Sequence, residues 1–514
     1  MSKTIIIIGA GLAGLSAALQ AAENGCNVKL VSSLPSERAQ SVMAEGGINA
    51  ALNTKDENDS PEEHFTDTIK AACGLADPNA VWGMTQAAPE LVHWLLKLGV
   101  KFNMSGYDDV DLRNFGGQKK KRTAFAQSDT GKQIMTAMID AVRRKEASGM
   151  VERFSHHSFL TLRLCGNICC GCVIRDEYSQ ETVELPGDAV IVATGGMHGL
   201  FGNTTGSLSN TGEVTAELFR LGVPLANGEM IQYHPTTVKC GGKRMLISEA
   251  ARGEGGRLFA MKDGKQWYFM EEKYPELGNL MPRDITAREI WNVSHESEVF
   301  LDMTEISEEI ISNKLSGLAD DCMTYLHKDI RKEPVSVLPG IHYFMGGILV
   351  DEQHRTPIQN LCAAGECCAQ YHGANRLGGN SLLGALYGGR VAAKSACEQA
   401  DVVDLSCATQ IDFPPASQIS EIKQLNKVMQ ETMGVVRNEN TLLNGIQTVQ
   451  ALTGNLPLLG MAVLKSALAR KESRGAHWRE DYPKSNDDDY LKTTVARFDG
   501  KQIQISFVPV PERR

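Results

Sequence analysis

The chain has 514 residues, a formal net charge of −10, and 42% hydrophobic residues. It is too long for one ordinary domain and apolar enough for sizeable cores, so several lobes are expected. The negative charge argues against a nucleic-acid partner, because phosphate binding needs a concentrated basic surface. No apolar run reaches the roughly 18–20 residues that a transmembrane helix needs.

The first residues predict a dinucleotide-binding unit. A strand-like run at residues 4–8 is followed by a helical pattern and by a second strand at 28–31. Three glycines with GxGxxG spacing stand between the first strand and the helix: Gly9, Gly11 and Gly14. They permit a tight turn, close approach of a pyrophosphate and helix–strand contact. The second strand ends at Ser32, where NAD-binding folds often carry an acidic ribose ligand, so NAD is not favoured.

Residues 151–196 alternate apolar and polar positions and end in AVIVATGG, which predicts short strands and a buried strand with a glycine turn. Four cysteines lie within this region: Cys165, Cys169, Cys170 and Cys172. Adjacent cysteines in an apparent hairpin give poor tetrahedral geometry, so no metal site is predicted. Thirteen cysteines in a chain of this length, with no signal peptide evident, predict reduced thiols and a cytoplasmic location.

The segment 372–390, HGANRLGGNSLLGALYGGR, combines polar residues, glycines and an apolar helical pattern. Ser381 is a natural N-cap for that helix. A helix starting there would aim unpaired N–H groups at the electron-rich pyrimidine end of a reduced flavin. Arg376 could hold a carboxylate through a bidentate fork. One loop is therefore predicted to contact both cofactor and substrate.

This segment closely resembles the flavin and substrate loop of fumarate reductase and succinate dehydrogenase flavoproteins, and more loosely that of L-aspartate oxidase. The resemblance covers nearly the whole chain. It implies an α/β fold: a two-lobed FAD flavoprotein with a Rossmann-like FAD domain, an inserted capping domain for substrate, and a C-terminal helical region. The expected divisions are FAD-binding residues 1–229, capping residues 230–345, FAD-binding residues 346–400 and C-terminal residues 401–514.

The same resemblance implies FAD as the cofactor. In the family, a loop matching residues 36–52 carries a His covalently bonded to the flavin, but alignment on Glu45, Gly46 and Gly47 puts Gln40 there. We therefore expect non-covalent FAD, and a tilt toward alkene reduction or oxidase activity. The FAD-contacting residues implied are Gly9, Gly11, Gly14, Ser32, Gln40, Ser41, Glu45, Gly46, Gly47, Glu213, Glu366, Ser381 and Leu382.

The resemblance also implies a dicarboxylate site, with His234 and Ser248 on one carboxylate and His342 and Arg376 on the other. A small dianion entering a closed pocket loses hydration at several kcal/mol per charge unless donors replace the water. Twisting one carboxylate out of conjugation would polarise the double bond and open one carbon to hydride from flavin N5.

The neighbouring carbon then needs a proton. By resemblance the donor is Arg283, reloaded through Glu249 and Arg252. Arginine is a peculiar acid, so nearby cations must disfavour its charged state while a carboxylate relays the proton. The alternative is that these three residues form a structural ion-pair cluster.

We therefore expect the flavoprotein of a fumarate reductase or succinate dehydrogenase, favouring reduction. L-Aspartate oxidase is the first alternative, but that subfamily places a Glu at Phe115 and Met-Ala-Ser at residues 377–379. Reduction of another 2-enoate is also open, as is a non-catalytic flavin-binding electron-transfer role, which Arg283, His342 and Arg376 oppose. The resemblance implies an iron–sulfur partner subunit, which could hold the chain at the inner face of a membrane. The C-terminal region is shorter than in many quinone-linked relatives, which argues against that docking.

Overall fold

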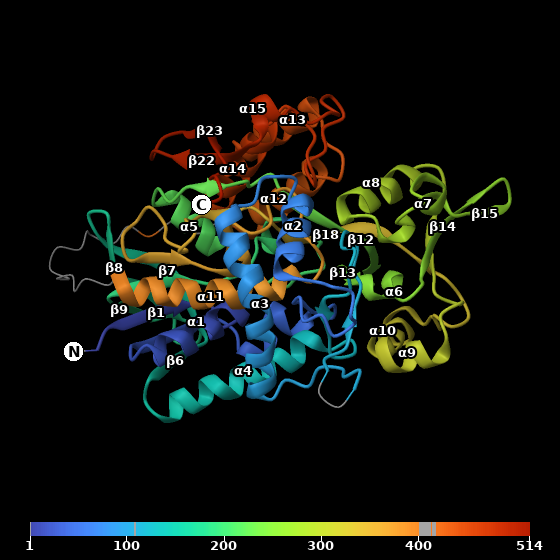
Figure 1. The fold of residues 1–514 in the computed structure, drawn as a ribbon. Helices are drawn as coiled ribbons and strands as arrows, with labels where there is room; N and C mark the ends of the chain where they lie inside the picture. The colour runs from blue at the N-terminus through green and yellow to red at the C-terminus, as the bar shows by residue number, and fades with distance from the viewer. Residues whose placement is uncertain (1, 107–108, 400–412, 414–417) are drawn as a thin grey trace.

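The computed structural model describes residues 2–106, 109–399, 413 and 418–514. Figure 1 shows a central α/β body, a lobe projecting to one side of it, and a C-terminal region packed on another face. The central body is called the FAD-type body, after the cofactor that the resemblance implies. The predicted division between residues 400 and 401 lies outside the described residues.

A five-stranded parallel sheet forms the centre of the body, in the order β20-β10-β1-β2-β6. Its strands are β1 (Thr4–Ile8), β2 (Asn27–Ser32), β6 (Val151–Ser155), β10 (Ala189–Val192) and β20 (Leu361–Ala363). The strands predicted at 4–8, 28–31 and in AVIVATGG are therefore confirmed. Ile5 and Ile7 enter one core cluster and Ile6 and Ile8 another, because alternate side chains point to opposite faces and both faces are buried.

Helices cover one face of this sheet, and a three-stranded antiparallel sheet packs near the other. These helices are α1 (Leu12–Glu23), α3 (Pro78–Leu98), α4 (Thr130–Ala147) and α11 (Asn380–Gln399), and α2 (Pro61–Ala71) packs on α3. The second sheet contains β7 (His157–Cys165), β8 (Ile168–Asp176) and β9 (Thr182–Pro186). Shorter elements of the body are η2 (Gln40–Met43), β3 (Ile48–Asn49), β4 (Leu112–Arg113), β5 (Thr123–Ala124), η3 (His198–Leu200) and α5 (Glu213–Arg220).

The projecting lobe is formed between the two FAD-binding segments and has its own apolar core. Its first sheet, β13-β12-β18, contains β12 (Ile231–Cys240), β13 (Lys243–Leu246) and β18 (Leu338–Phe344). The second sheet contains β14 (Arg257–Lys262), β15 (Lys265–Trp267), β16 (Val299–Asp302) and β17 (Val335–Ser336). Its helices are α6 (Glu249–Gly253), α7 (Phe269–Lys273), α8 (Arg283–Val293), α9 (Glu308–Lys314) and α10 (Ser316–Asp321), followed by η5 (Cys322–Leu326).

The C-terminal region contains the expected helices and also a hairpin that the sequence analysis did not predict. The helices are α12 (Ile419–Thr432), α13 (Glu439–Val449), α14 (Asn455–Ala469) and α15 (Asp487–Tyr490). The hairpin, β22 (Lys492–Phe498) and β23 (Ile503–Pro509), joins a sheet with β11 (Leu225–Ala226), β19 (Gly347–Leu349) and β21 (Cys368–Ala369). It therefore continues a sheet of the FAD-binding body.

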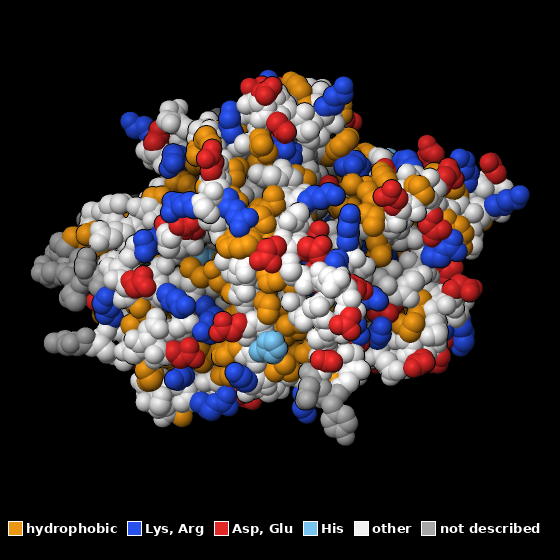
Figure 2. Space-filling model, viewed as in Figure 1, with side chains coloured by type: hydrophobic (Ala, Val, Ile, Leu, Met, Phe, Trp, Pro, Cys, Tyr) orange, Lys and Arg blue, Asp and Glu red, His pale blue; other side chains and the backbone are white. Residues whose placement is uncertain are grey.

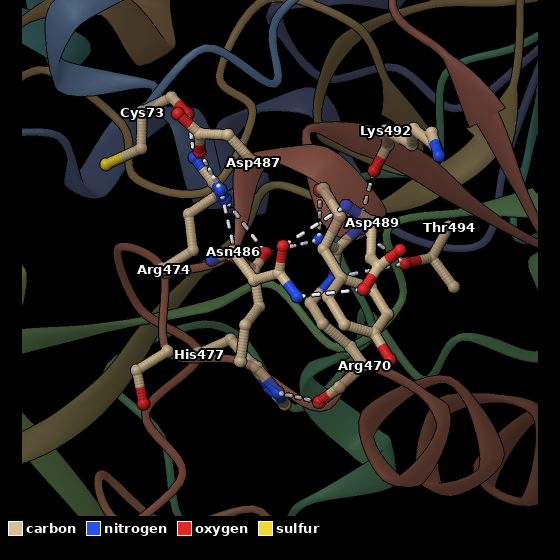
Figure 3. A network of polar contacts seen from close by, with 12 residues as sticks. Cys73, Arg470, Arg474, His477, Asn486, Asp487, Asp489, Lys492 and Thr494 are labelled. Atoms are coloured by element: carbon tan, nitrogen blue, oxygen red, sulfur yellow. Dashed lines mark hydrogen bonds and ion pairs between the residues drawn. The ribbon is translucent and has the colours of Figure 1, made fainter. Parts of the chain in front are cut away.

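A buried ionic network in the segment after α14 attaches this region to the body (Figure 3). Arg470 is fully buried, and its Nε donates to Glu229 Oε1 at 2.7 Å while its Nη1 donates to Glu472 Oε1 at 2.7 Å. Arg474 donates to Glu472 and to the backbone carbonyl of Cys73. These contacts place the chain immediately beside the 372–376 segment, where the Ala476 N–H donates to the Ala374 carbonyl.

Acidic and basic side chains are interspersed over the face that Figure 2 displays. Among the described residues, no helix has both the length and the apolar character that crossing a bilayer requires. The cysteine residues differ in oxidation state: Cys169, Cys170 and Cys172 are buried free thiols, whereas Cys165 is disulfide-bonded. The expectation of reduced thiols is therefore wrong at Cys165.

Candidate functional site

A cavity of about 560 Å³ lies where the FAD-type body meets the projecting lobe. Most of the residues predicted for cofactor and substrate line it: Gly9, Gly11, Ser32, Gln40, Ser41, Glu45, Gly46, Gly47, Glu213, His234, Ser248, Glu249, Arg283, His342, Glu366, Arg376, Ser381 and Leu382. Gly14 and Arg252, which were also predicted for the site, are not among the residues that line the cavity. A Cβ on Gly14 would lie 1.8 Å from the Gly9 carbonyl oxygen, so this glycine permits the contact between helix and strand.

One end of the cavity fits a dinucleotide phosphate. Gly9 has φ +110°, and a Cβ there would lie 2.3 Å from the carbonyl oxygen of Ala193. Helix α1 starts beside it with no acidic residue in its first turn, so its N–H groups present positive charge. The Ser32 hydroxyl is buried with no hydrogen-bond partner, which leaves it free for a polar ligand group. These features fit the pyrophosphate and ribose portions of FAD.

The start of α11 forms the other end. The helix begins at Asn380, so Ser381 lies in its first turn and not at the predicted N-cap. Asn49 donates from Nδ2 to the Gly378 carbonyl and to Asn380 Oδ1, at 2.7 and 2.8 Å. Gly379 has φ +84°, and a Cβ there would lie 2.1 Å from Asn49 Oδ1. Gly379, Ser381 and Leu382 of this turn line the cavity.

Gln40 and Glu45 also line the cavity, although they are far from this turn in the sequence. Gln40 Oε1 accepts a hydrogen bond from the Ser207 N–H at 2.6 Å. Burial, with a smaller contribution from Asp321, raises the pKa of Glu45 from 4.5 to about 8. Glu45 is therefore protonated at neutral pH and adds no negative charge to the cavity.

Two imidazoles and a guanidinium meet in the same cavity. His234 on β12 and His342 on β18 come together because these strands pair antiparallel, and their ring centroids are 5.1 Å apart. The Arg376 guanidinium lies over the Tyr343 ring at 4.5 Å. His234 Nε2 and Arg376 Nε are buried with no hydrogen-bond partner. Such orphaned polar groups indicate a ligand that supplies the missing acceptors.

Burial is the main cause of the unusual ionisation here. It lowers the pKa of His234 and His342 well below the ordinary value, and the positive charge of Arg283 lowers both further. Burial, then Arg283, lowers the pKa of Arg376 to about 9. Both rings are therefore neutral at pH 7 while the guanidinium remains charged.

Arg283, Glu249 and Arg252 form a connected chain. Arg283 donates from Nε and Nη2 to Glu249 Oε2, at 2.8 and 2.5 Å. Arg252 Nη2 lies 3.4 Å from Glu249 Oε1 across one turn of α6, because residues three apart share a helix face. Burial would raise the pKa of Glu249, but Arg283 and Arg252 outweigh it and lower the pKa below its ordinary value. The carboxylate is therefore ionised and bridges two guanidinium groups.

The sequence analysis did not name Gln232 or Thr205. Gln232 donates from Nε2 to the Arg376 carbonyl at 2.8 Å and accepts at Oε1 from Arg283 Nη1 at 3.1 Å. Because it precedes His234 by two residues on a strand, the period of two could have placed it on the same face. Thr205 lines the cavity and contacts His342, from a loop whose sequence carries no comparable signal.

Comparisons with known proteins agree with this geometry. The family model described as "FAD binding domain" matches residues 4–382, and that described as "Fumarate reductase flavoprotein C-term" matches residues 452–513. The chain is 38% identical to the succinate dehydrogenase flavoprotein subunit of Bacillus subtilis, over 100% of this chain and 98% of that protein. It is 32% identical to the 8-methylmenaquinol:fumarate reductase flavoprotein subunit of Wolinella succinogenes, over 100% and 92%.

Among solved structures, FrdA of E. coli quinol fumarate reductase matches with a TM-score of 0.90 at 27% identity, over 99% of this chain and 97% of that chain. The sequence relatives, the family model and this fold all point to one group. The chain belongs to the succinate dehydrogenase and fumarate reductase flavoprotein family of FAD-dependent oxidoreductases.

Proposed function

We propose that this chain reduces fumarate, with non-covalently bound FAD, as the flavoprotein component of a fumarate reductase or succinate dehydrogenase. The observation that carries the proposal is the meeting of His234, His342, Arg376 and Arg283 in one cavity that also receives the glycine turn of the FAD fold. Related subunits named for succinate dehydrogenase and for fumarate reductase support the substrate class. FAD bound here would supply hydride to the double bond.

The residues for holding FAD are those of the two glycine turns. Gly9 and Gly11 with the start of α1 would hold the pyrophosphate, while Ser381 and Leu382 would face the flavin. Gln40 supports non-covalent attachment because its amide lacks the nucleophilic ring nitrogen of the histidine that the family uses. Its carbonyl oxygen is already engaged by the Ser207 N–H.

The cavity would bind a dicarboxylate through donors on both sides. His234 and Ser248 would hold one carboxylate, and His342 and Arg376 the other. Replacing water around a dianion requires several donors, and the orphaned nitrogens of His234 and Arg376 supply two. Donors that hold one carboxylate out of the plane of the double bond would also polarise it.

Arg283 is the proposed proton donor. Arg252 and Arg376 place further positive charge near it. Glu249 Oε2 contacts Arg283 at two nitrogens, so a proton can return through the carboxylate with Arg252 beyond it. A purely structural ion-pair cluster would not need to face the cavity, yet both Arg283 and Glu249 line it.

Phe115 separates this proposal from an L-aspartate oxidase. It is 2% exposed, lines the cavity and stands beside Gly46 and Gly378. An aspartate ammonium at this position would meet an aromatic ring where the oxidase subfamily offers a carboxylate. A fumarate molecule carries no amine and needs no such partner.

An iron–sulfur subunit is the proposed electron donor. Met43 and Leu208, which are 62% and 44% exposed, flank the Gln40–Ser207 contact at the edge of the cavity. Exposed apolar side chains near the cofactor site would suit contact with such a subunit, although the shorter C-terminal region argues against the docking seen in quinone-linked relatives.

An anaerobic assay of the purified chain tests the proposal. A reduced low-potential dye would be offered with fumarate, other 2-enoates and aspartate in separate reactions. We expect dye oxidation with fumarate. Aspartate-dependent peroxide formation in air without fumarate turnover would reverse the assignment. Acid precipitation should leave the yellow flavin in the supernatant, and flavin retained in the protein pellet would contradict non-covalent attachment.

A further inference from the structure

The hydroxyl group of Thr205 contacts the Nδ1 atom of the His342 ring. Its Oγ1 is 2.7 Å from His342 Nδ1, although the two residues are 137 positions apart in the chain. The backbone fixes this arrangement, because the Thr205 N–H donates to the Ile341 carbonyl at 2.9 Å and Thr204 forms a β-bridge with Ile341. The contact is therefore held by main-chain pairing next to the ring.

The direction of this hydrogen bond follows from the acceptors available. The single hydroxyl proton can reach His342 Nδ1 at 2.7 Å or the Ile341 carbonyl at 3.4 Å. The 3.4 Å contact is longer than an ordinary O–H···O hydrogen bond, whereas 2.7 Å is well within hydrogen-bond range, so we assign the hydroxyl proton to the contact with Nδ1. A neutral imidazole that accepts at Nδ1 must carry its own proton on Nε2.

Charge around the ring supports the neutral form. The groups that face His342 are Arg283 from α8, Arg376 from the 372–376 segment, His198 from η3 and His234 from β12. None of these supplies a negative charge that would favour an imidazolium ion. The ring can therefore donate to a ligand only through Nε2–H.

We propose that Thr205 is a positioning residue that fixes the tautomer and orientation of His342, so that Nε2–H is presented to a substrate carboxylate. The inference rests on the proposed dicarboxylate function of the site. It makes His342 a hydrogen-bond donor that needs no protonation from solvent.

The second imidazole lacks this arrangement. His234 Nδ1 faces both the carbonyl of Thr236, at 3.1 Å, and the N–H of Thr236, at 3.3 Å. The Thr236 hydroxyl also lies 3.4 Å from His234 Nδ1, but it donates to the Ile247 carbonyl at the shorter distance of 2.8 Å. No single hydroxyl therefore sets the His234 tautomer, and substitution of Thr205 should affect only the His342 end of the site.

Thr205→Val and Thr205→Ser test the proposal, since Val keeps the shape and Ser keeps the hydroxyl. Malonate binding would be measured from the absorbance of bound flavin. We expect Val to weaken malonate binding by about 3- to 10-fold, and Ser to stay within about 2-fold of wild type. The KM for fumarate should rise with Val while kcat changes by less than about 2-fold. Equal affinity in wild type and Val, or a Ser variant as weak as Val, would overturn the proposal.

The tautomer can be read directly by nitrogen NMR of ¹⁵N-histidine-labelled holoprotein. The His342 signals would be assigned by their loss in a His342→Gln variant. We expect the proton on Nε2 and a bare Nδ1 in wild type and in Thr205→Ser. A proton on Nδ1 refutes the inference even if the Val variant folds poorly. If wild type neither binds malonate nor reduces fumarate, the proposed function fails, and the NMR result still decides the role of Thr205.

Discussion

Replacing Arg283 with Gln should abolish most proton delivery while leaving the rest of the site able to bind. The substitution removes two hydrogen bonds to Glu249 Oε2 and one to Gln232. General acid catalysis typically contributes ~10²–10⁴ in rate, which corresponds to about 3–5 kcal/mol of transition-state stabilisation. Fumarate-dependent reoxidation of the reduced flavin should slow by that factor.

Binding should change less than the rate. Ser248, Arg376 and the two imidazoles still line the cavity after the substitution. Burial is the main cause of the lowered pKa of His234 and His342 and is unchanged, so both rings remain neutral hydrogen-bonding groups. We expect malonate affinity to fall by no more than about 10-fold. Arg283→Lys is the matched control, because it keeps a positive charge and a proton but loses the bidentate contact with Glu249.

Anaerobic stopped-flow measurement separates these effects. Photoreduced enzyme would be mixed with fumarate, and in parallel with an oxidised dye that needs no proton from Arg283. The Gln variant should react normally with the dye and slowly with fumarate, and the Lys variant should lie between Gln and wild type. A Gln variant with full FAD that keeps more than about one tenth of the fumarate rate would show that Arg283 is not the donor.

Three further substitutions test the cofactor turn, the ionic network and the buried acid. Gly9→Ala should lower the FAD-to-protein ratio, measured by absorbance after purification, because its Cβ would lie 2.3 Å from the Ala193 carbonyl oxygen. Arg470→Met should lower the free energy of unfolding by ~3–5 kcal/mol in urea titration, because it leaves Glu229 buried without its partner, and a loss under about 1 kcal/mol would contradict this. The fold favours protonated Glu45, so its contribution to stability is full below about pH 4.5 and is lost as pH rises through about 8. The difference in unfolding free energy between apo wild type and Glu45→Gln should therefore fall across this window, and a constant difference would contradict it.

Much of the fold was predictable because local signals and long-range structure agree. The GxGxxG spacing of the glycines after β1 predicts a tight turn between a strand and a helix, and the structure has both. The run of Ile residues before it predicts a strand that is buried on both faces. The resemblance to the flavoprotein family assigned His234, His342 and Arg376 to one site. Their segments, β12, β18 and residues 372–376, are far apart in sequence. The geometry agrees, since all three line one cavity.

The remaining features depend on contacts that sequence patterns do not encode. Thr205 reaches His342 only because an isolated bridge joins two distant segments. Apolar and polar residues alternate along the β22–β23 hairpin, as is typical of strands. The sequence does not show that β22 pairs with β11 and so attaches the hairpin to the body. Ser381 was predicted as the N-cap, but α11 begins one residue earlier, at Asn380. The Asn380 side chain is hydrogen-bonded to Asn49 and His64, contacts that the sequence pattern does not show.

The charge balance of the cluster formed by Arg252, Arg283, Arg376 and Glu249 favours a dianion and gives a final prediction. Arg252, Arg283 and Arg376 contribute three positive charges and Glu249 one negative charge, a balance of +2 with both imidazoles neutral. A dicarboxylate neutralises this excess, whereas zwitterionic aspartate with net charge −1 does not.

Arg376→Gln should therefore weaken malonate binding by ~10- to 150-fold, the range for a lost charged hydrogen bond of about 1.5–3 kcal/mol. Propionate, with one carboxylate, can use the His234 and Ser248 side of the cavity, so its affinity should change by less than about 3-fold. Flavin absorbance titration of both ligands, at equal FAD content and fixed salt, measures the ratio. Equal losses for the two acids would show that Arg376 acts on the whole cavity and does not recognise the second carboxylate.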